Sequence, residues 1–424
     1  MIQSICTQPL FARTRTHLQP GAVYRLVRDD FTKVVMQGTA AEGWFKVFKS
    51  NGEVRELGNT AASRVRVKDS SGTSPYFLWT INKSTDAFGN TITYTYHKDE
   101  VSGINYPLSI QYGQNNDVTI SFSYARRDDA VPVQLANIEA EQLVLLHTID
   151  IKLDGAKVRQ YRLASELATE GWRRLDQVQE CGYHETGSVA ECLQPLNFNW
   201  LSDPDTEYKT AISQIVDGLG AVTEFDYVMM TSASSAGKFS ERPFGNEVLP
   251  TEAEVLEADE DGNLKSVVTT MRKSNGLGGL HQTDYAYHGN GLVNTKNWGF
   301  LGFYAQRITD TASGIVTYKQ FRLDEPHFVQ VAATHQYDHN FGYHTQTLSK
   351  IENRFSQQVF THSSGKTTGH PFRSALLLYQ YDNNVLVGVK NITVSNQYAS
   401  GLLTQRTETT SFAHGATASG SGTF

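Results

Sequence analysis

With 424 residues, the chain is long enough for two or three domains, and it can bury a core without a disulfide framework or a metal. The formal net charge is −7 and the Lys and Arg residues are scattered, which argues against nucleic acid as a partner. No stretch approaches the roughly 18 apolar residues that span a bilayer, and the first residues lack the apolar segment of a signal peptide. We therefore expect no transmembrane segment and no recognisable Sec signal.

Turn dipeptides and alternating strands follow one another along the chain. Asn-Gly and Asp-Gly pairs supply the positive φ of tight hairpin turns. Apolar residues alternate over Thr91–Tyr96, Val118–Tyr124 and Val222–Tyr227, which is the pattern of a strand with one buried face. We expect short helices only around Ala164–Trp172 and Thr251–Leu256. The turn pairs are Asn51-Gly52, Asp154-Gly155, Asp217-Gly218, Asp261-Gly262, Asn275-Gly276 and Asn290-Gly291.

One segment of the chain repeats in another without a gap, since Asp86–Tyr96 aligns with Asp217–Tyr227. Asp and Gly make a turn, and two aromatic residues spaced by two place their rings on one face of the following strand. Such repetition predicts an all-β fold of short antiparallel strands and hairpins in a rolled or stacked sheet. The repeated positions are Asp86, Gly89, Tyr94 and Tyr96, matched by Asp217, Gly220, Phe225 and Tyr227. Weaker forms of the strand half are Phe122-Ser-Tyr124, Tyr285-Ala-Tyr287 and Tyr379-Gln-Tyr381.

The polar segment Leu201–Thr210 contains a proline and follows a strand that closes at Trp200, which marks a domain boundary. We therefore predict two β regions, residues 1–205 and 206–424. The small and polar C-terminal tail is typical of disorder or of the abrupt end of a longer sequence.

The three cysteines, Cys6, Cys181 and Cys192, are too few for a disulfide framework, and no Cys-x-x-Cys pair indicates a zinc or redox site. Cys181 and Cys192 flank a turn-rich loop that can close as a hairpin. A disulfide between them and two small buried or half-buried thiols fit this pattern equally well.

Several patterns of chemically active residues have a simpler structural explanation. Phe360–Thr367 ends like a phosphate-binding loop but lacks its first glycine. Asp259–Asn263 begins like a calcium loop but lacks the later ligands. His335 and His339 lie four residues apart on what we expect to be an extended chain, so roughly 13 Å separates them and they cannot share a zinc ion. Solvated strand histidines explain these two, and His344, better.

Two further groups of residues are ambiguous between a site and plain structure. Glu139-Ala-Glu141 and Glu252-Ala-Glu254 have the spacing of ADP-ribosyltransferase acids, but no Ser-Thr-Ser strand supports them, and we interpret them as solvated acidic loops. The aromatic residues from Trp298 to Tyr304 can form a sugar platform or a sheet core, and the glycines among them favour the core. We therefore predict no catalytic residue, no cofactor and no metal site.

The repeats resemble the YD repeats of bacterial Rhs proteins, and longer stretches resemble the lineage of SpvB and the insecticidal Tc-toxin B component. Trp79–Asn90 is similar to a "W-x-x-x-K-x-x-D-x-x-G-N" segment of this lineage. Cys181–Trp200 is similar to its cysteine-containing loop and terminal "P-x-x-F-x-W" strand. Ile215–Ala221 and Trp298–Phe303 are similar to the opening and the "G-F-L-G-F" hallmark of its middle region. The FG-GAP-like propeller repeats, the long YD array and the C-terminal toxin domain of the lineage are missing from the sequence.

The resemblance implies an SpvB-like region over residues 1–205 and a Tc-toxin B middle-like region over 206–424. It further implies a non-enzymatic scaffold segment of a β-sheet shell that encloses or delivers a toxic polypeptide. That polypeptide, or other toxin-complex subunits, would be its partners. Such a chain is secreted or extracellular as part of a toxin complex, and cytoplasmic before release. The alternative is a secreted or surface module whose loops bind a glycan or a protein receptor.

Overall fold

In the computed structural model the described residues lie almost entirely in strands and turns, which confirms the all-β prediction. Two single-turn 3-10 helices occur among the described residues, η1 (Ala61–Ser63) and η2 (Gln114–Asn116). The described residues are 10–12, 19–26, 30–39, 41–66, 76, 78–99, 104–135, 138–168, 171–184, 187–201, 211–229, 253–255, 266–288, 292–294, 299–322, 330–338, 346–361, 367–382, 385–399, 402–414 and 422–423.

The chain forms two compact units. Unit 1 comprises Met1–Asn199, Val216–Gly220 and Thr361–Thr368. Unit 2 comprises Trp200–Ile215, Ala221–Phe360 and Gly369–Phe424. The sequence-based boundary between residues 205 and 206, with the family character assigned to each side, stays a prediction.

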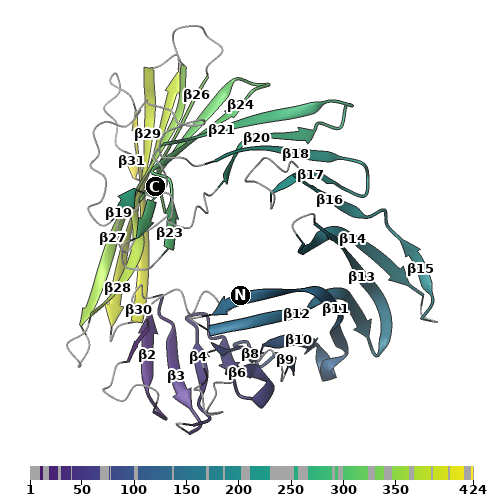
Figure 1. The fold of residues 1–424 in the computed structure, drawn as a ribbon. Helices are drawn as coiled ribbons and strands as arrows, with labels where there is room; N and C mark the ends of the chain where they lie inside the picture. Colours follow the sequence, from purple (N-terminus) through teal and green to yellow (C-terminus); the bar gives the residue numbers. More distant parts are fainter. Residues whose placement is uncertain are drawn as a thin grey trace. The chain divides into compact units, whose positions relative to one another are not determined.

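Unit 1 is built on an antiparallel meander. Its strands are β1 (Leu10–Ala12), β2 (Val23–Leu26), β3 (Lys33–Gln37), β4 (Trp44–Phe48), β5 (Val54–Leu57), β6 (Arg64–Val65), β7 (Leu78–Trp79), β8 (Ile81–Thr85), β9 (Thr91–Lys98), β10 (Asn105–Tyr112), β11 (Val118–Leu135), β12 (Ile138–Leu153), β13 (Ala156–Leu167), β14 (Arg173–Tyr183), β15 (Val189–Cys192) and most of β16 (Leu196–Trp200). Pairing runs in chain order from β1 to β5, passes to β8, and continues to β14 (Figure 1). β14 also pairs with β15 and β16, while β6 and β7 form a small sheet of their own.

Unit 2 repeats the antiparallel plan. Its strands are most of β17 (Ile212–Val216), β18 (Val222–Met229), β19 (Ala253–Val255), β20 (Ser266–Ser274), β21 (Leu280–His288), β22 (Leu292–Asn294), β23 (Gly299–Gly302), β24 (Ala305–Asp310), β25 (Ile315–Arg322), β26 (Gln330–Asp338), most of β27 (Gln346–Thr361), most of β28 (Thr367–Asp382), β29 (Val385–Ala399), β30 (Leu402–His414) and β31 (Gly422–Thr423). One series of pairs runs β18, β20, β21, β24, β25, β26, β27, and another runs β28 to β31. β19, β22 and β23 form a separate three-stranded sheet.

The turn dipeptides lie where hairpins close. Asn51-Gly52 joins β4 to β5, Asp154-Gly155 joins β12 to β13, and Asn275-Gly276 joins β20 to β21. Asp261-Gly262 and Asn290-Gly291 lie outside the described residues.

The expectation of short helices was wrong in its described parts. Ala164–Leu167 belongs to β13, where these residues pair with Arg173–Gln177 of β14. An ion pair of 2.6 Å between Arg174 and Glu166 adds to this pairing. The residues 253–255 form β19. In both places, pairing with a neighbouring strand outweighs a weak local preference for helix.

A buried apolar cluster lies on and beside strands β2 to β5 of unit 1. Alternate residues of β2 and β3 point inward, as period-2 patterning requires. The Phe45 ring meets the rings of Tyr24 and Trp79 edge to face, at centroid distances of 5.9 and 4.9 Å. The Trp79 indole N–H donates to the main-chain oxygen of Gly43 at 2.8 Å. The buried members of the cluster are Ala22, Tyr24, Val34, Met36, Val47 and Leu57.

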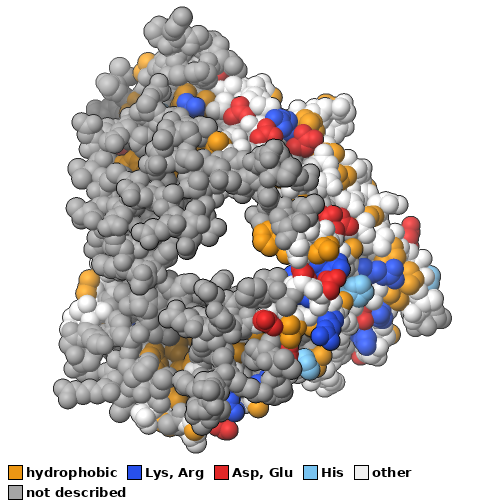
Figure 2. Space-filling model, in the orientation of Figure 1, with side chains coloured by type: hydrophobic (Ala, Val, Ile, Leu, Met, Phe, Trp, Pro, Cys, Tyr) orange, Lys and Arg blue, Asp and Glu red, His pale blue; other side chains and the backbone are white. Residues whose placement is uncertain are grey.

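Strands β11 to β14 are longer and less buried. β11 has 18 residues and β12 has 16, and most of their described side chains are half-exposed. Positive and negative side chains are interleaved over the described part of the face in view (Figure 2). Polar contacts join the strands to one another: Gln160 donates to Asp150 at 2.7 Å, Arg174 pairs with Glu166, and the Arg173 N–H donates to Asp129.

Candidate functional site

The two copies of the repeat build the same turn, which joins β8 to β9 in the first copy and β17 to β18 in the second. The Asp86 carboxylate accepts the main-chain N–H of Phe88 at 2.9 Å, and the Asp217 carboxylate accepts that of Leu219 at 2.8 Å. In the first copy the Asn90 side-chain amide also donates to Asp86 at 2.7 Å, and this bond lowers the pKa of Asp86. Aspartate is suited to this position because its short side chain can accept main-chain N–H groups within the turn.

Glycine closes each of these turns. The N–H groups of Gly89 and Gly220 donate to the main-chain oxygens of Asp86 and Asp217, at 3.2 and 3.0 Å. Their φ angles are +89° and +81°, a conformation that strains any residue with a Cβ.

The second aromatic residue of each copy makes a hydrogen bond to the preceding strand that the sequence did not predict. The Tyr96 hydroxyl donates to the main-chain oxygen of Ile81 at 2.6 Å, and the Tyr227 hydroxyl donates to that of Ile212 at 2.9 Å. Each bond reaches back 15 residues, to the first residue of the preceding strand. Burial raises the pKa of both hydroxyls, so they remain neutral donors. We name this contact the tyrosine latch.

Two weaker relatives of the repeat make the same latch. Tyr124 donates to the main-chain oxygen of Pro107 at 2.6 Å, and Tyr287 donates to that of Val268 at 2.7 Å. Burial raises the pKa of Tyr124 to about 12. In the relative Tyr379-Gln-Tyr381 the first aromatic residue makes a different contact, since the Tyr379 hydroxyl donates to the Glu352 carboxylate at 3.1 Å.

A signal for the latch was present in the sequence. The first aromatic position of the four latched copies holds Tyr94, Phe122, Phe225 and Tyr285. The second position is tyrosine in all four: Tyr96, Tyr124, Tyr227 and Tyr287. A ring is needed at both places, but a hydroxyl is needed only at the second.

Three turns expose a large apolar residue at the same place. Phe88, Leu219 and Leu277 are 91%, 97% and 91% exposed, and each follows two residues after the side chain that caps its turn. In the third turn that side chain is Asn275, which accepts the N–H of Leu277 at 2.8 Å. Gly276–Gly279 is thus an ordered turn between β20 and β21.

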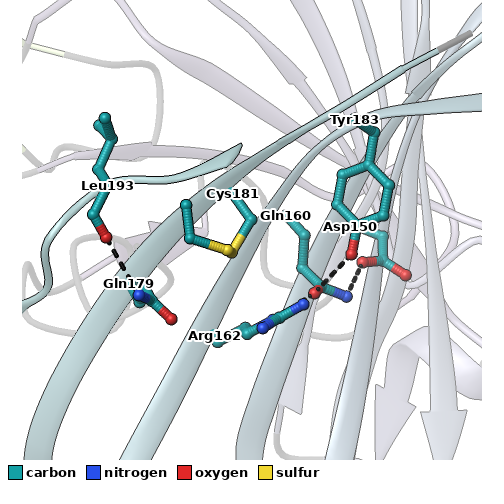
Figure 3. The surroundings of a disulfide bond; sticks show 8 residues. Asp150, Gln160, Arg162, Gln179, Cys181, Tyr183 and Leu193 are labelled. Carbon is teal, nitrogen blue, oxygen red and sulfur yellow. Dashed lines mark hydrogen bonds between the residues drawn. A yellow bond between two sulfur atoms is a disulfide. The ribbon is translucent and has the colours of Figure 1, made fainter. Parts of the chain in front are cut away.

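The structure joins Cys181 to Cys192 in a disulfide, with the sulfurs 2.04 Å apart (Figure 3). The two residues are direct partners in the β14–β15 ladder. Cys181 is fully buried beside its β13 partner Gln160. Gln160 accepts hydrogen bonds from Tyr183 at 3.0 Å and from Arg162 at 2.8 Å, so the strands around Cys181 are held by polar contacts (Figure 3).

A mainly apolar cavity of about 390 Å³ lies beside this hairpin in unit 1. The turn of the second repeat contributes to its wall, and a Cβ on Gly218 would come within 2.4 Å of the Gln194 main-chain oxygen. Glycine is therefore required for the turn to approach this closely. The lining residues are Tyr161, Val178, Glu180, Leu193, Gln194, Leu196, Asp217, Gly218 and Leu219.

The other chemical candidates do not assemble into a site within the described part of the chain. No group of three His, Cys, Asp or Glu side chains there can hold a metal ion. His335 lies on β26, where burial and the nearby charge of Lys350 lower its pKa. Glu139 and Glu141 lie on β12, so the expectation of a loop was wrong there, because both pair with β11 residues. His339, His344, Glu252, Asp259–Asn263 and the centre of Phe360–Thr367 lie outside the described residues.

The aromatic residues near Trp298 include a ring pair inside unit 2. The Tyr287 and Phe303 rings lie 4.5 Å apart, and Tyr304 is buried. Trp298 itself lies outside the described residues. The described contacts are those of packed rings, with Tyr287 also engaged in its latch.

Comparison with known families gives a match over residues 27–151 to the model described as "SpvB: Salmonella virulence plasmid 65kDa B protein". This segment is similar to the SpvB family. It covers less than a third of the chain and contains the first copy of the repeat with its latch. The resemblance to the SpvB family is thus confirmed for this segment.

Solved structures give weaker likenesses. The N-terminal domain of effector protein SpvB from Salmonella typhimurium strain LT2 matches with a TM-score of 0.33 and 16% identity, over 42% of this chain and 71% of that domain. The crystal structure of TcdB2-TccC3-TEV matches with a TM-score of 0.34 and 11% identity, over 93% of this chain and 31% of that one. The chain thus spans under a third of the latter. No curated protein matches the chain. The resemblance to the SpvB family rests on the family-model match over residues 27–151.

Proposed function

We propose that the chain is a wall segment of a toxin complex, a non-enzymatic β scaffold that encloses or delivers a toxic polypeptide. The observation that carries this proposal is the continuous meander of unit 1, in which strands pair in chain order from β8 to β14. A sheet paired in this way satisfies its internal main-chain groups, so it can separate the space on its two sides. The SpvB-family match overlaps this meander from β3 to β12 and supports a toxin context.

The partners in this proposal are the toxic polypeptide itself or other subunits of the toxin complex. The chain would be made in the cytoplasm and act outside the producing cell as part of the released complex. Among its described residues, no helix is long and apolar enough to cross a membrane.

The test is co-expression of the full chain with the toxin polypeptides encoded beside it, followed by pull-down and limited proteolysis. We expect a toxin polypeptide to co-purify and to resist protease only when the chain is present. A well-folded chain that neither binds nor protects any neighbour would overturn the wall role. Specific binding to a glycan or receptor array would then favour the surface-module alternative.

A matched pair of variants sharpens this test. Ile149 lies in β12 and pairs with Phe122 on one side and Tyr161 on the other. Proline there removes a ladder N–H and breaks the sheet, whereas alanine keeps the main chain intact. We expect Ile149→Pro to abolish cargo protection and Ile149→Ala to retain it.

A further inference from the structure

Among the described residues of the β14–β15 hairpin in unit 1, the turn is closed by main-chain hydrogen bonds from His184 to Ser188 at 2.9 Å and from Gly187 to His184 at 2.8 Å, and the ladder beyond it is short. β15 has four residues and only three paired positions with β14. Val189, Ala190 and Glu191 are all exposed. Beyond Cys192, Leu193 donates its N–H to Glu180 and accepts a hydrogen bond from Gln179. A hairpin this short, with so little buried apolar surface, is marginally stable by itself.

The disulfide is therefore the strongest constraint on this segment, residues 184–195. Cys181 lies in the middle of the ladder, because its strand also pairs with β13 at Gln160. Cys192 lies at the end of β15, just before Leu193. Breaking the bond would leave Cys181 in place and free Cys192 to move.

The same segment forms one wall of the apolar cavity. Leu193 and Gln194 line it directly after Cys192, whereas Tyr161 and Val178 line it from strands β13 and β14. β16 keeps its own contact with β14, since Gln177 pairs with Asn197 and their side chains are hydrogen-bonded at 3.0 Å. Release of Cys192 would thus loosen one wall without detaching β16.

We propose that Cys181 and Cys192 form a redox clasp on residues 184–195. In a reducing compartment both are thiols and the hairpin opens locally. In an oxidising compartment the disulfide closes the hairpin and fixes the cavity wall. Cytosol keeps thiols reduced, and extracellular space permits disulfides. The opening and closing of the disulfide do not depend on the proposed function. Their use to distinguish compartments does rest on it, because it assumes that the chain is released from the cytoplasm of the producing cell.

Closure needs an oxidant, for which a small-molecule disulfide such as oxidised glutathione suffices. The Cys192 thiol is the less buried of the two, so its thiolate attacks first and one glutathione leaves as a thiol. The Cys181 thiolate then attacks the Cys192 sulfur of the mixed disulfide, and the second glutathione leaves. Two protein thiols are oxidised, one glutathione disulfide is reduced to two thiols, and each departing thiolate takes up a proton that a cysteine lost.

The experiment is hydrogen exchange by mass spectrometry on the full chain, equilibrated in oxidised or reduced glutathione. Reduction should lower the protection of the 184–195 amides by about a hundredfold, the scale expected for opening a disulfide-closed loop. The amides of β13 should not change. A Cys192→Ser variant should show the open behaviour in both buffers, and a Cys6→Ser variant should respond like the unmodified chain.

Three results would overturn the clasp. The first is equal protection of residues 184–195 in both buffers. The second is a loss of protection that extends through β13, since the bond would then support the whole ladder. The third is a chain that keeps free thiols at Cys181 and Cys192 in oxidised glutathione, as read from its intact mass. None of these results depends on whether the chain protects a toxin polypeptide.

Discussion

Strands β2 to β5 and strands β11 to β14 lie in the same meander, yet they are stabilised differently. The first group surrounds a buried apolar cluster that includes Met36 and Leu57, each at most 6% exposed. The second group is longer and half-exposed, and it is joined by polar contacts such as those of Asp129 and Gln160. Apolar packing needs side chains that converge from several strands, whereas a polar contact needs only one partner group on another strand. A sheet can therefore extend beyond its apolar core where polar contacts between strands stabilise it instead. We call strands β11 to β14 the extension.

The largest expected effect is on the buried cluster. Leu57→Ala should destabilise strands β2 to β8 by about 2–5 kcal/mol, because it leaves a cavity among packed side chains. Leu153 is 47% exposed at the end of β12, so Leu153→Ala should change stability by no more than about 0.5 kcal/mol. Hydrogen exchange in increasing urea would measure each group of strands separately. Equal losses of stability in the two variants would contradict the division of the sheet into a core and an extension.

The polar contacts of the extension should show in its response to acid. A side-chain hydrogen bond from Arg127 lowers the pKa of Asp129 from 3.8 to about 2. A lowered pKa means that the ionised form stabilises the fold above the unfolded value of 3.8, and that this stabilisation is lost as the pH falls towards 2. We expect exchange in β11 to β14 to accelerate over that range. Asp129→Asn should be less stable at neutral pH and show a weaker acid dependence, and an unchanged acid profile would exclude this role.

The tyrosine latches of unit 1 lie between the two groups of strands, on β9 (Tyr96), and at the start of the second group, on β11 (Tyr124), and loss of either should have a smaller effect. Tyr96→Phe and Tyr124→Phe each leave a main-chain oxygen without its donor, which should lower the free energy of unfolding by about 0.5–1.5 kcal/mol. Tyr94→Phe is the matched control, because that position tolerates phenylalanine in other copies of the repeat. Urea unfolding of the four proteins would compare them. A loss for Tyr94→Phe equal to that for Tyr96→Phe would mean that the ring environment, and not the latch, is responsible.

The smallest effect is expected at the exposed turn residues. Phe88→Ser and Leu277→Ser should change stability by less than about 0.5 kcal/mol, since both side chains are 91% exposed. The same urea experiment measures this. A loss above about 1 kcal/mol for Phe88→Ser would show that the turn between β8 and β9 contributes to the stability of the sheet.

The fold class and the repeated turns could be predicted from the sequence because they depend on local patterns. Alternation over Thr91–Tyr96 and Val118–Tyr124 gave strands that the structure contains as parts of β9 and β11. The paired Asp and Gly positions lie in closed turns between strands. These features need only neighbouring residues, so one sequence is enough to find them.

The remaining features depend on which strands become neighbours. The acceptor of the Tyr96 hydroxyl is the main chain of Ile81, and no residue type at position 81 announces it. Ala164–Leu167 was expected to be helical, and only its pairing with β14 makes it a strand. Asp129 meets the main chain of Arg173, 44 residues away, through the arrangement of three hairpins. Periodicity along one segment carries no information about such partners.

The short reach of the latches has a consequence for how the chain acquires its structure. Each of the four tyrosines bonds to a residue only 15 to 19 positions earlier. Contacts of such low sequence separation form quickly, because little chain entropy is lost in closing them. During synthesis, the strand that carries each acceptor oxygen leaves the ribosome before the strand that carries the tyrosine. The acceptor is therefore available when the tyrosine emerges. The meander can therefore assemble vectorially during synthesis, with few unpaired strand edges waiting for a distant partner.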